Sequence, residues 1–205
     1  MSLQSQKPIT LRGSAQIVVE FFEYGIHTIL YQRGIYPAED FKSIKKYGQT
    51  LLVNNDDNVK AYLKQILIQL EKWIMAKTIS KLVLVISSKE TREVLERWQF
   101  DIDLVKDDDI TTQKKSGGAN KTEKEINMEI SAIMRNITAS GSFLPMIDEP
   151  CTFNVLAYTE KDAEVPTTWV DSDPKIIENA EQVRLRSFST NIHKVDSLVA
   201  YKVVD

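Results

Sequence analysis

The chain is poor in the residues that most often build reactive sites. Its 205 residues include one cysteine, Cys151, and two histidines, His27 and His193. A lone cysteine excludes an intrachain disulfide and is compatible with a reducing compartment. The two histidines lie far apart in the sequence, so we expect each to be a hydrogen-bonding residue at the edge of the core rather than a ligand.

The chain also lacks the motifs of common catalytic and nucleotide-binding sites. It contains no Walker-type phosphate loop, no G-x-G-x-x-G, no H-E-x-x-H and no G-x-S-x-G. Cys151 precedes an apolar run and is expected to be a small buried residue rather than a nucleophile. Residues 107–109 are aspartates without the spacing or the glycine of a calcium loop. We therefore expect a protein that is not an enzyme and that has no cofactor or metal.

Long apolar runs and an excess of positive charge are absent as well. The apolar stretch over residues 17–31 is interrupted by Glu20, Glu23 and His27, and is too short and polar to span a bilayer. Residues 1–13 lack the apolar core of a signal peptide. The net charge of −3 gives no general attraction to nucleic acid or anionic lipid. We expect a soluble intracellular protein that binds neither nucleic acid nor membrane.

Apolar side chains at three- and four-residue spacing predict three helices. The first is expected over residues 14–32 with Ser14 as its N-cap, and the second over 56–76 with Asp56 or the next aspartate as its cap. The third begins at the capping box Thr122-Glu123-Lys124-Glu125. With 42% apolar and 27% charged residues, the composition is that of an ordinary globular protein.

Three strands are expected between these helices. Residues 81–87 form a continuous apolar run, residues 95–104 alternate apolar and polar side chains, and residues 152–159 form a third run. Consecutive strands without an intervening helix favour antiparallel pairing. We therefore predict an α+β fold, with three helices packed on one face of a mostly antiparallel sheet.

The last part of the chain is rich in strand-forming residues and follows a body that already looks complete. Two alternating runs, residues 183–188 and 192–204, come after the polar stretch 159–182. Such a tail can close the sheet or clasp another chain. A second polar stretch, residues 106–121, has almost no apolar anchor and is expected to be a mobile loop.

Several segments carry a strong resemblance to a known family. The longest are residues 11–41 (LRGSAQIVVEFFEYGIHTILYQRGIYPAEDF), 95–103 (LERWQFDID) and 184–202 (RLRSFSTNIHKVDSLVAYK). Shorter matches are Phe143-Leu144-Pro145, and Val165-Pro166 followed by Trp169. From residue 9 to residue 203 the chain resembles the HORMA-domain family, and within it the proteins of the spindle assembly checkpoint.

The resemblance implies a single HORMA domain over residues 1–205. Its core body would span residues 9–159, and a mobile C-terminal safety belt, residues 160–205, would cross over a captured extended peptide. The family has an open form, in which the belt covers the sheet edge that takes the peptide, and a closed form. In the closed form the belt moves to the opposite side of the sheet. Pairing of residues 184–204 with 152–159 would mark the open form, and pairing with 95–104 the closed form.

The function implied is that of a peptide-capturing switch that delays anaphase. It would bind a coiled-coil adaptor at kinetochores and sequester the activator of the anaphase-promoting complex. Open and closed copies would self-associate, and a remodelling AAA+ ATPase is a further candidate partner. The implied locations are the nucleus and the kinetochore, and also the cytoplasm.

The resemblance and the strand pattern together assign residues to these roles. The peptide-binding edge is predicted to include Phe153, Val155, Ala157 and Tyr158. The belt residues are Trp169, Arg184, Leu185, Phe188, His193, Val199 and Tyr201. Arg135, Asn136 and Phe143 match the surface between open and closed copies, and Leu11 matches a position that controls the conformer. Trp73 is expected on the core face of its helix, with a place beside the peptide groove as the alternative.

Two alternatives remain open at this stage. One keeps the fold and changes the client, as in the HORMA adaptor of a translesion DNA polymerase or a protein of the meiotic chromosome axis. The other is a small hydrolase that uses Cys151 as its nucleophile.

Overall fold

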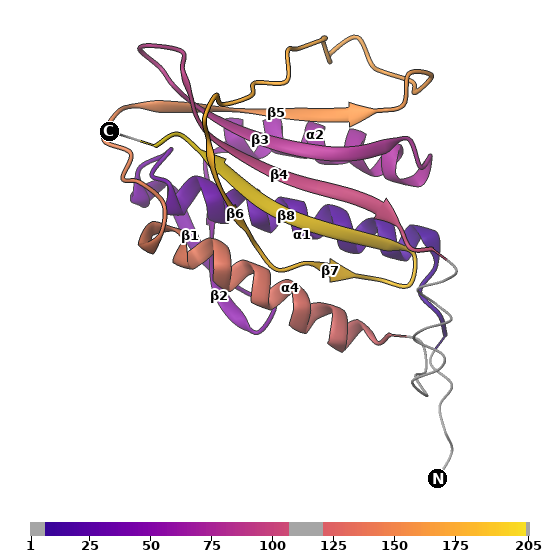
Figure 1. The fold of residues 1–205 in the computed structure, drawn as a ribbon. Helices are drawn as coiled ribbons and strands as arrows, with labels where there is room; N and C mark the ends of the chain where they lie inside the picture. The colour runs from indigo at the N-terminus through magenta and orange to yellow at the C-terminus, as the bar shows by residue number, and fades with distance from the viewer. Residues whose placement is uncertain (1–6, 107–120, 204–205) are drawn as a thin grey trace.

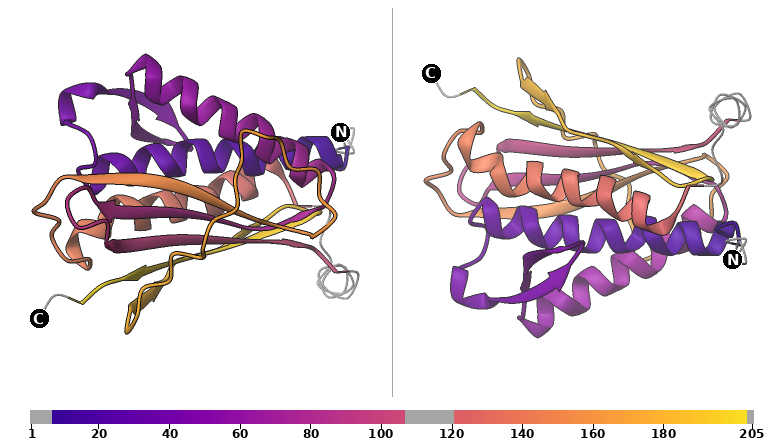
Figure 2. Two further views of the ribbon diagram at one scale, coloured as in Figure 1. Left: turned by 90° about the horizontal axis from the view of Figure 1, so that it is seen from above. Right: turned by 90° about the horizontal axis from the view of Figure 1, so that it is seen from below.

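The computed structural model describes residues 7–106 and 121–203. Within these residues, three long helices lie on one face of a six-stranded antiparallel sheet, as Figures 1 and 2 show. The main strand order is β5-β3-β4-β8-β6, and β7 pairs with β8 beside β6. The predicted α+β architecture is confirmed. The expected mobile loop falls largely on residues 107–120, which lie outside the described residues.

Helix α1 (Leu11–Gln32) begins three residues earlier than predicted. Its N-cap is Thr10, whose side chain accepts a hydrogen bond from the Gly13 N–H at 3.0 Å. The prediction of Ser14 as the cap was therefore wrong. Ser14 is buried in the first turn, where its hydroxyl contacts the C-terminal part of the chain.

Helices α2 (Asp57–Met75) and α4 (Glu123–Thr138) begin where the capping signals predicted. The Asp56 carboxylate accepts the N–H groups of Asn58 and Val59. At α4 both halves of the capping box are formed, because Thr122 and Glu125 each accept the backbone N–H of the other. A short 3₁₀ turn, η2 (Ala139–Ser142), follows α4.

Strands β3 (Ile79–Ser88), β4 (Val94–Leu104) and β5 (Cys151–Thr159) form the predicted antiparallel centre of the sheet. β3 lies between the other two and is buried on both faces over most of its length. The C-terminal part of the chain adds β6 (Glu181–Arg184), β7 (Phe188–Ser189) and β8 (His193–Tyr201).

The single strand predicted over residues 183–188 is interrupted. Arg184 lies opposite Leu198, whereas Phe188 lies opposite Val195, so the tail has one extra residue relative to its partner strand. Such an extra residue bends a strand. The bend directs Phe188 into the core, where its ring lies 4.8 Å from that of Phe21, centroid to centroid.

A hairpin that the sequence reasoning missed connects the first two helices after the 3₁₀ turn η1 (Ala38–Asp40). It consists of β1 (Phe41–Lys46) and β2 (Gln49–Asn54). The two turn residues, Tyr47 and Gly48, have φ values of 53° and 71°, which is typical of the tight turns that match strand twist. Tyrosine is an unusual residue at such a position, so the turn gave no clear signal in the sequence.

A cluster of phenylalanines joins the helices, the sheet and the C-terminal tail. The ring of Phe100 on β4 lies 5.8 Å from that of Phe21 and 5.4 Å from that of Phe22, and Phe188 completes the cluster. All four side chains are at most 1% exposed. Burying a side chain of this size contributes about 1.5–3 kcal/mol, so Phe188 holds the tail firmly in this arrangement.

A buried ion pair fixes the end of α1 to the sheet. The Arg33 Nε donates to the Glu96 carboxylate at 2.8 Å, and the Arg33 Nη2 also donates to the Pro145 carbonyl at 2.6 Å. The Trp98 indole N–H donates to the other carboxylate oxygen at 3.1 Å. Both charges are therefore paired and further hydrogen-bonded, as charges at this depth require.

We expect Arg33→Met to lower the free energy of unfolding by about 3–5 kcal/mol, because it leaves the Glu96 carboxylate buried without a cation. Adding Glu96→Gln to that variant should restore at least about 1 kcal/mol, since the remaining amide is neutral and can still accept from Trp98. Chemical denaturation of both single variants and the double variant measures the coupling.

The partly exposed pair Lys46–Glu20 provides the control for this experiment. Lys46→Met should cost less than about 1 kcal/mol, because water screens that pair. Strictly additive effects of the Arg33 and Glu96 substitutions would contradict the account of the buried pair.

Candidate functional site

The C-terminal strand β8 pairs with β4 and not with β5. The register runs from Glu96 opposite Tyr201 to Leu104 opposite His193. This is the pairing that the resemblance assigns to the closed form. Strand β5 is consequently an edge strand, whose only partner among the described residues is β3.

The segment between β5 and β6 passes around this free edge. It leaves β5 on the side of α2 and crosses to the opposite face of the sheet before it reaches β6 (Figures 1 and 2). Residues 160–180 contain no helix or strand. The part over residues 164–174, here called the arch, lies between two side chains of the body that bind its backbone. The Trp73 indole N–H donates to the Glu164 carbonyl at 2.9 Å, and the Arg97 Nε donates to the Pro174 carbonyl at 3.1 Å.

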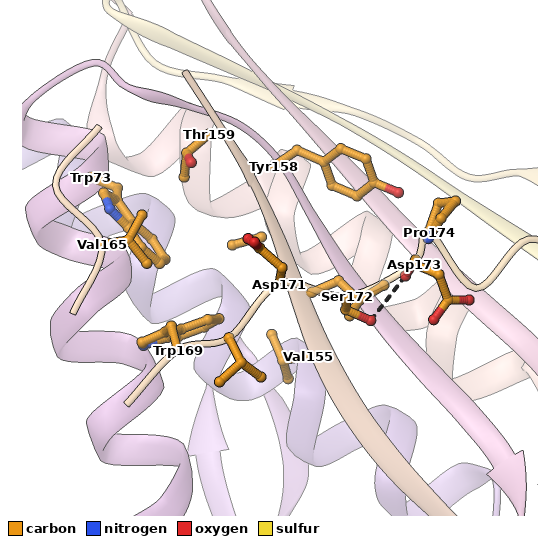
Figure 3. A pocket seen from close by; sticks show the side chains of 13 residues that line it. Trp73, Val155, Tyr158, Thr159, Val165, Trp169, Asp171, Ser172, Asp173 and Pro174 are labelled. Atoms are coloured by element: carbon orange, nitrogen blue, oxygen red, sulfur yellow. Dashed lines mark hydrogen bonds between the residues drawn. The ribbon is translucent and has the colours of Figure 1, made fainter. Parts of the chain in front are cut away.

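The arch and the edge of β5 enclose a groove. Two adjoining hollows of about 300 and about 650 Å³ share Val155, Leu156 and the arch residues from Trp169 to Ser172. Volumes of this size suit several side chains of a bound chain. Figure 3 shows the smaller hollow, with Trp73, Val165 and Trp169 on one side and Ser172, Asp173 and Pro174 toward the other.

Trp73 serves both the core and the groove. It is only 3% exposed, yet it lines the smaller hollow and packs edge-to-face on Trp169 with ring centroids 4.9 Å apart. The expectation of plain core packing therefore covers only part of its environment. The tryptophan pair forms the rigid apolar end of the groove.

The predicted edge residues divide between the two faces of β5. Val155 and Ala157 pack against the core, and both line the groove with Tyr158, whose hydroxyl accepts from Arg97 Nη2 at 2.8 Å. Phe153 lines neither hollow, because its buried ring packs against Tyr36 and Tyr62. Leu156, Thr159 and the arch residues from Val170 to Pro174 also line the groove and were not predicted.

Of the predicted belt residues, only Trp169 reaches the groove; the others dock the tail on the body. Phe188, His193 and Val199 are buried, Leu185 and Tyr201 are partly buried, and Arg184 is exposed. Arg186, two residues after Arg184, is exposed as well. It lies beyond the end of β6, and its backbone N–H donates to the Asn136 side chain at 3.3 Å.

His193 links the tail to the first turn of α1. The Ser14 hydroxyl lies 2.7 Å from His193 Nδ1 and 2.6 Å from the Thr190 hydroxyl. Burial lowers the pKa of His193 to about 4, so the ring is neutral at physiological pH. His27 accepts the Asn54 N–H at 3.1 Å, and burial lowers its pKa to about 4 as well.

The residues predicted for self-association lie around the C-terminal half of α4. Arg135 is exposed and donates to the Ser131 hydroxyl at 3.0 Å, beside a shallow hollow that also includes Tyr47 and the 63%-exposed Met128. Asn136 contacts the tail, as described above, and Phe143 is half-buried against the core. Leu11 is the first residue of α1 and is half-buried.

The described residues offer little support for catalysis or for metal binding. Cys151 is 6% exposed, and burial raises the pKa of its thiol, which disfavours the reactive thiolate. Within residues 7–106 and 121–203 no three histidine, cysteine or acidic side chains gather as a metal site would require. In the same ranges no helix is long and apolar enough to cross a membrane.

Comparison with known proteins gives a consistent result. The model of the HORMA domain matches residues 14–193. The chain is 55% identical to the mitotic spindle checkpoint component mad2 of Schizosaccharomyces pombe, over 95% of this chain and 94% of that protein. It is 50% identical to the human mitotic spindle assembly checkpoint protein MAD2A, over 99% of this chain and 97% of the other.

Solved structures agree in fold. A chain of the crystal structure of the mitotic checkpoint complex matches with a TM-score of 0.83 and 52% identity, over 93% of this chain and 99% of that one. Caenorhabditis elegans HTP-2 bound to a HIM-3 closure motif matches with a TM-score of 0.72 over 95% of this chain and 93% of that one. At 13% identity, the second match shows a shared fold only.

We expect the stability of the folded chain to fall as the pH drops from about 6.5 to about 4. In that window the unfolded chain binds protons at His193 and His27, whereas the folded chain does not. Replacing His193 with Gln should reduce the loss of unfolding free energy between pH 7 and pH 4.5 by about 2 kcal/mol. Urea denaturation at the two pH values measures this difference.

His27→Gln tests the same argument at the second buried histidine. It should reduce the loss of unfolding free energy between pH 7 and pH 4.5 by a similar amount. Carboxylates that titrate in the same range are common to all variants and cancel in the comparison. An unchanged pH dependence in His193→Gln would contradict the burial of a neutral ring at this position.

Proposed function

Because the chain belongs to the HORMA-domain family, we propose that it is a spindle assembly checkpoint protein that captures an extended peptide at the edge of β5. The observation that carries the proposal is the unpaired edge of β5 enclosed by the arch. Identities of 50–55% to checkpoint proteins over almost the whole chain support the same function. The proposed role is binding, without catalysis.

A guest peptide would add a strand to β5. Main-chain hydrogen bonds to the free N–H and C=O groups would supply affinity for almost any extended chain. Val155, Leu156, Ala157 and Trp169 would set the preference for apolar side chains, because they line the groove. The arch would then cover the guest and keep it from leaving sideways.

We propose that the described arrangement is the closed form of a two-state switch. In the other state the safety belt would leave β4 and cover the edge of β5 itself. The exchange must break the β4–β8 ladder and withdraw Phe188, Val195 and Val199 from the core. A change of this extent is far slower than loop motion, so capture and release should both be slow.

The proposed guests are a coiled-coil adaptor at kinetochores and the activator of the anaphase-promoting complex. Sequestering that activator would delay anaphase. The names of the checkpoint relatives and the match to the mitotic checkpoint complex support this assignment. A nuclear and kinetochore location follows from it, with a cytoplasmic pool, and an AAA+ ATPase is the proposed means of reopening the belt.

The other HORMA functions receive less support. The match to the zebrafish protein named MAD2B is 26% identical, and the HTP-2 structures match at 12–13% identity. Both values lie far below the 50–55% of the checkpoint group.

A reversible engineered disulfide between β4 and β8 tests whether the belt must open. Asp101 and Asp196 lie directly opposite each other in the register, at a spacing that suits a disulfide when both are replaced by Cys. Oxidised before the guest is added, Asp101→Cys/Asp196→Cys should capture no peptide, because β8 cannot leave β4. Oxidised after capture, it should hold the peptide without measurable release.

Reduction of the same protein is the internal control and should restore capture. The probe is a fluorescein-labelled peptide selected from a random 12-residue library on the full chain, followed by fluorescence anisotropy. Capture at an unchanged rate by the oxidised, empty protein would contradict belt opening and favour threading beneath the arch.

We further propose that the exposed surface around Arg135 and Phe143 joins an open copy to a closed copy. Arg135→Ala should weaken self-association at least about 10-fold, because a charged group that pairs across an interface contributes a few kcal/mol. Sedimentation velocity over a concentration series measures the effect. Lys64→Ala, an exposed change on α2, is the control and should leave association unchanged. Equal association of both variants would place the interface elsewhere.

A further inference from the structure

Arg97 is a buried cation whose hydrogen-bond partners are all neutral. It is 6% exposed, and among the described residues no carboxylate forms an ion pair with it. Its guanidinium donates to Gln99 Oε1 at 2.8 Å, to the Tyr158 hydroxyl at 2.8 Å and to the Pro174 carbonyl at 3.1 Å. Burying a guanidinium in this way is costly unless each acceptor is held in place.

The three acceptors come from three different segments. Gln99 belongs to β4, as does Arg97; Tyr158 belongs to β5, whose free edge borders the groove; and Pro174 ends the arch. One rigid, forked side chain thus joins the sheet to the safety belt. A lysine ammonium, a compact point charge on a flexible stem, could not hold the same three positions.

Pro174 suits this contact. Proline fixes its own φ and has no N–H group, so it presents a carbonyl on a stiff piece of chain. The residue before it, Asp173, is restricted to extended conformations for the same steric reason. The acceptor is a backbone atom, so the contact depends on the path of the arch rather than on a matching side chain.

The arch therefore has one anchor on each side of the sheet edge. On the helix side Trp73 binds the Glu164 carbonyl, and on the opposite face Arg97 binds the Pro174 carbonyl. Val165 and Val170, between the anchors, are 52% and 84% exposed. Trp169 packs on Trp73 near the first anchor, whereas the span from Val170 to Asp173 has few other fixed points. Freeing Arg97 from Pro174 therefore frees most of the arch after Trp169.

We propose that Arg97 is a positioning residue that holds the arch shut, and that it slows the release of a captured peptide. This inference rests on the proposed capture of a peptide at β5. Opening the arch on its outer side must separate the guanidinium from Pro174 before the guest can leave. A guest paired with β5 would also steady Tyr158, the second partner of Arg97, and so strengthen the closure.

The test compares Arg97→Met and Arg97→Lys with the wild-type full chain, using the labelled library-selected peptide. Dissociation is followed after adding an excess of unlabelled peptide. Arg97→Met should release the peptide about 10- to 100-fold faster, the range expected for losing a charge-assisted hydrogen bond. Arg97→Lys should fall between Arg97→Met and the wild type, because its ammonium keeps the positive charge and can still donate to one of the three acceptors.

Two further variants distinguish the loss of the Arg97–Pro174 contact from general changes on this face of the sheet. Lys81→Ala removes a cation that lies 5.1 Å from the Tyr158 ring, and no hydrogen bond joins Lys81 to the described part of the belt. Its release rate should stay within about twofold of wild type. Tyr158→Phe removes only the hydroxyl that accepts from Arg97, and it should accelerate release less than Arg97→Met does. Equal release by Arg97→Met and the wild type would overturn the proposal.

Hydrogen exchange on the empty proteins gives a readout that needs no guest. In Arg97→Met, amides of residues 165–178 should exchange at least about 10-fold faster, while those of β3 keep their protection. If the wild type captures no peptide, the proposed function fails, and exchange alone then decides whether Arg97 holds the arch. Unchanged exchange of residues 165–178, with β3 protected in both proteins, would overturn the proposal that Arg97 holds the arch shut.

Discussion

The edge of a β-sheet cannot stay both exposed and inert, and the architecture depends on how this chain meets that constraint. The body offers two strand edges, those of β4 and β5, and in the proposed switch the C-terminal tail pairs with one at a time. Here it pairs with β4, which leaves the N–H and C=O groups of β5 facing a groove. Covering one edge thus leaves the other free for the proposed guest peptide, and no separate ligand pocket has to be built.

The tail is held as a part of the fold and not as a loose appendage. Phe188 belongs to the aromatic cluster of the core, and His193 is hydrogen-bonded to Ser14 of α1. Glu129 of α4 accepts the Ser189 N–H at 3.1 Å. Moving the tail consequently disturbs the sheet and two helices together. In the proposed switch, packing of this kind would separate the two states by a large barrier, which suits a signal that must persist.

Local sequence signals predicted the elements whose determinants are local. The capping residues of α2 and α4, the apolar run of β3 and the alternation in β4 are each contained in one short stretch of the sequence. The β1–β2 hairpin was missed because Tyr47 adopts a positive φ without a typical turn residue. The roles of Arg97 and Ser14 could not be predicted at all, because the partners that join them to other segments are 61 to 179 residues away and meet them only in the folded chain.

Adjacent residues of β4 divide two tasks between the faces of one strand. Glu96 points toward the helices, where its hydrogen bonds come from Arg33 and Trp98 of the body and not from the belt. Arg97 points to the opposite face, where its contact with Pro174 exists only while the arch is closed. The first contact contributes to the stability of the body, and the second contributes only to the closed state. Because alternate residues of a strand face opposite sides, the chain can adjust guest retention at one position without weakening the fold at the next.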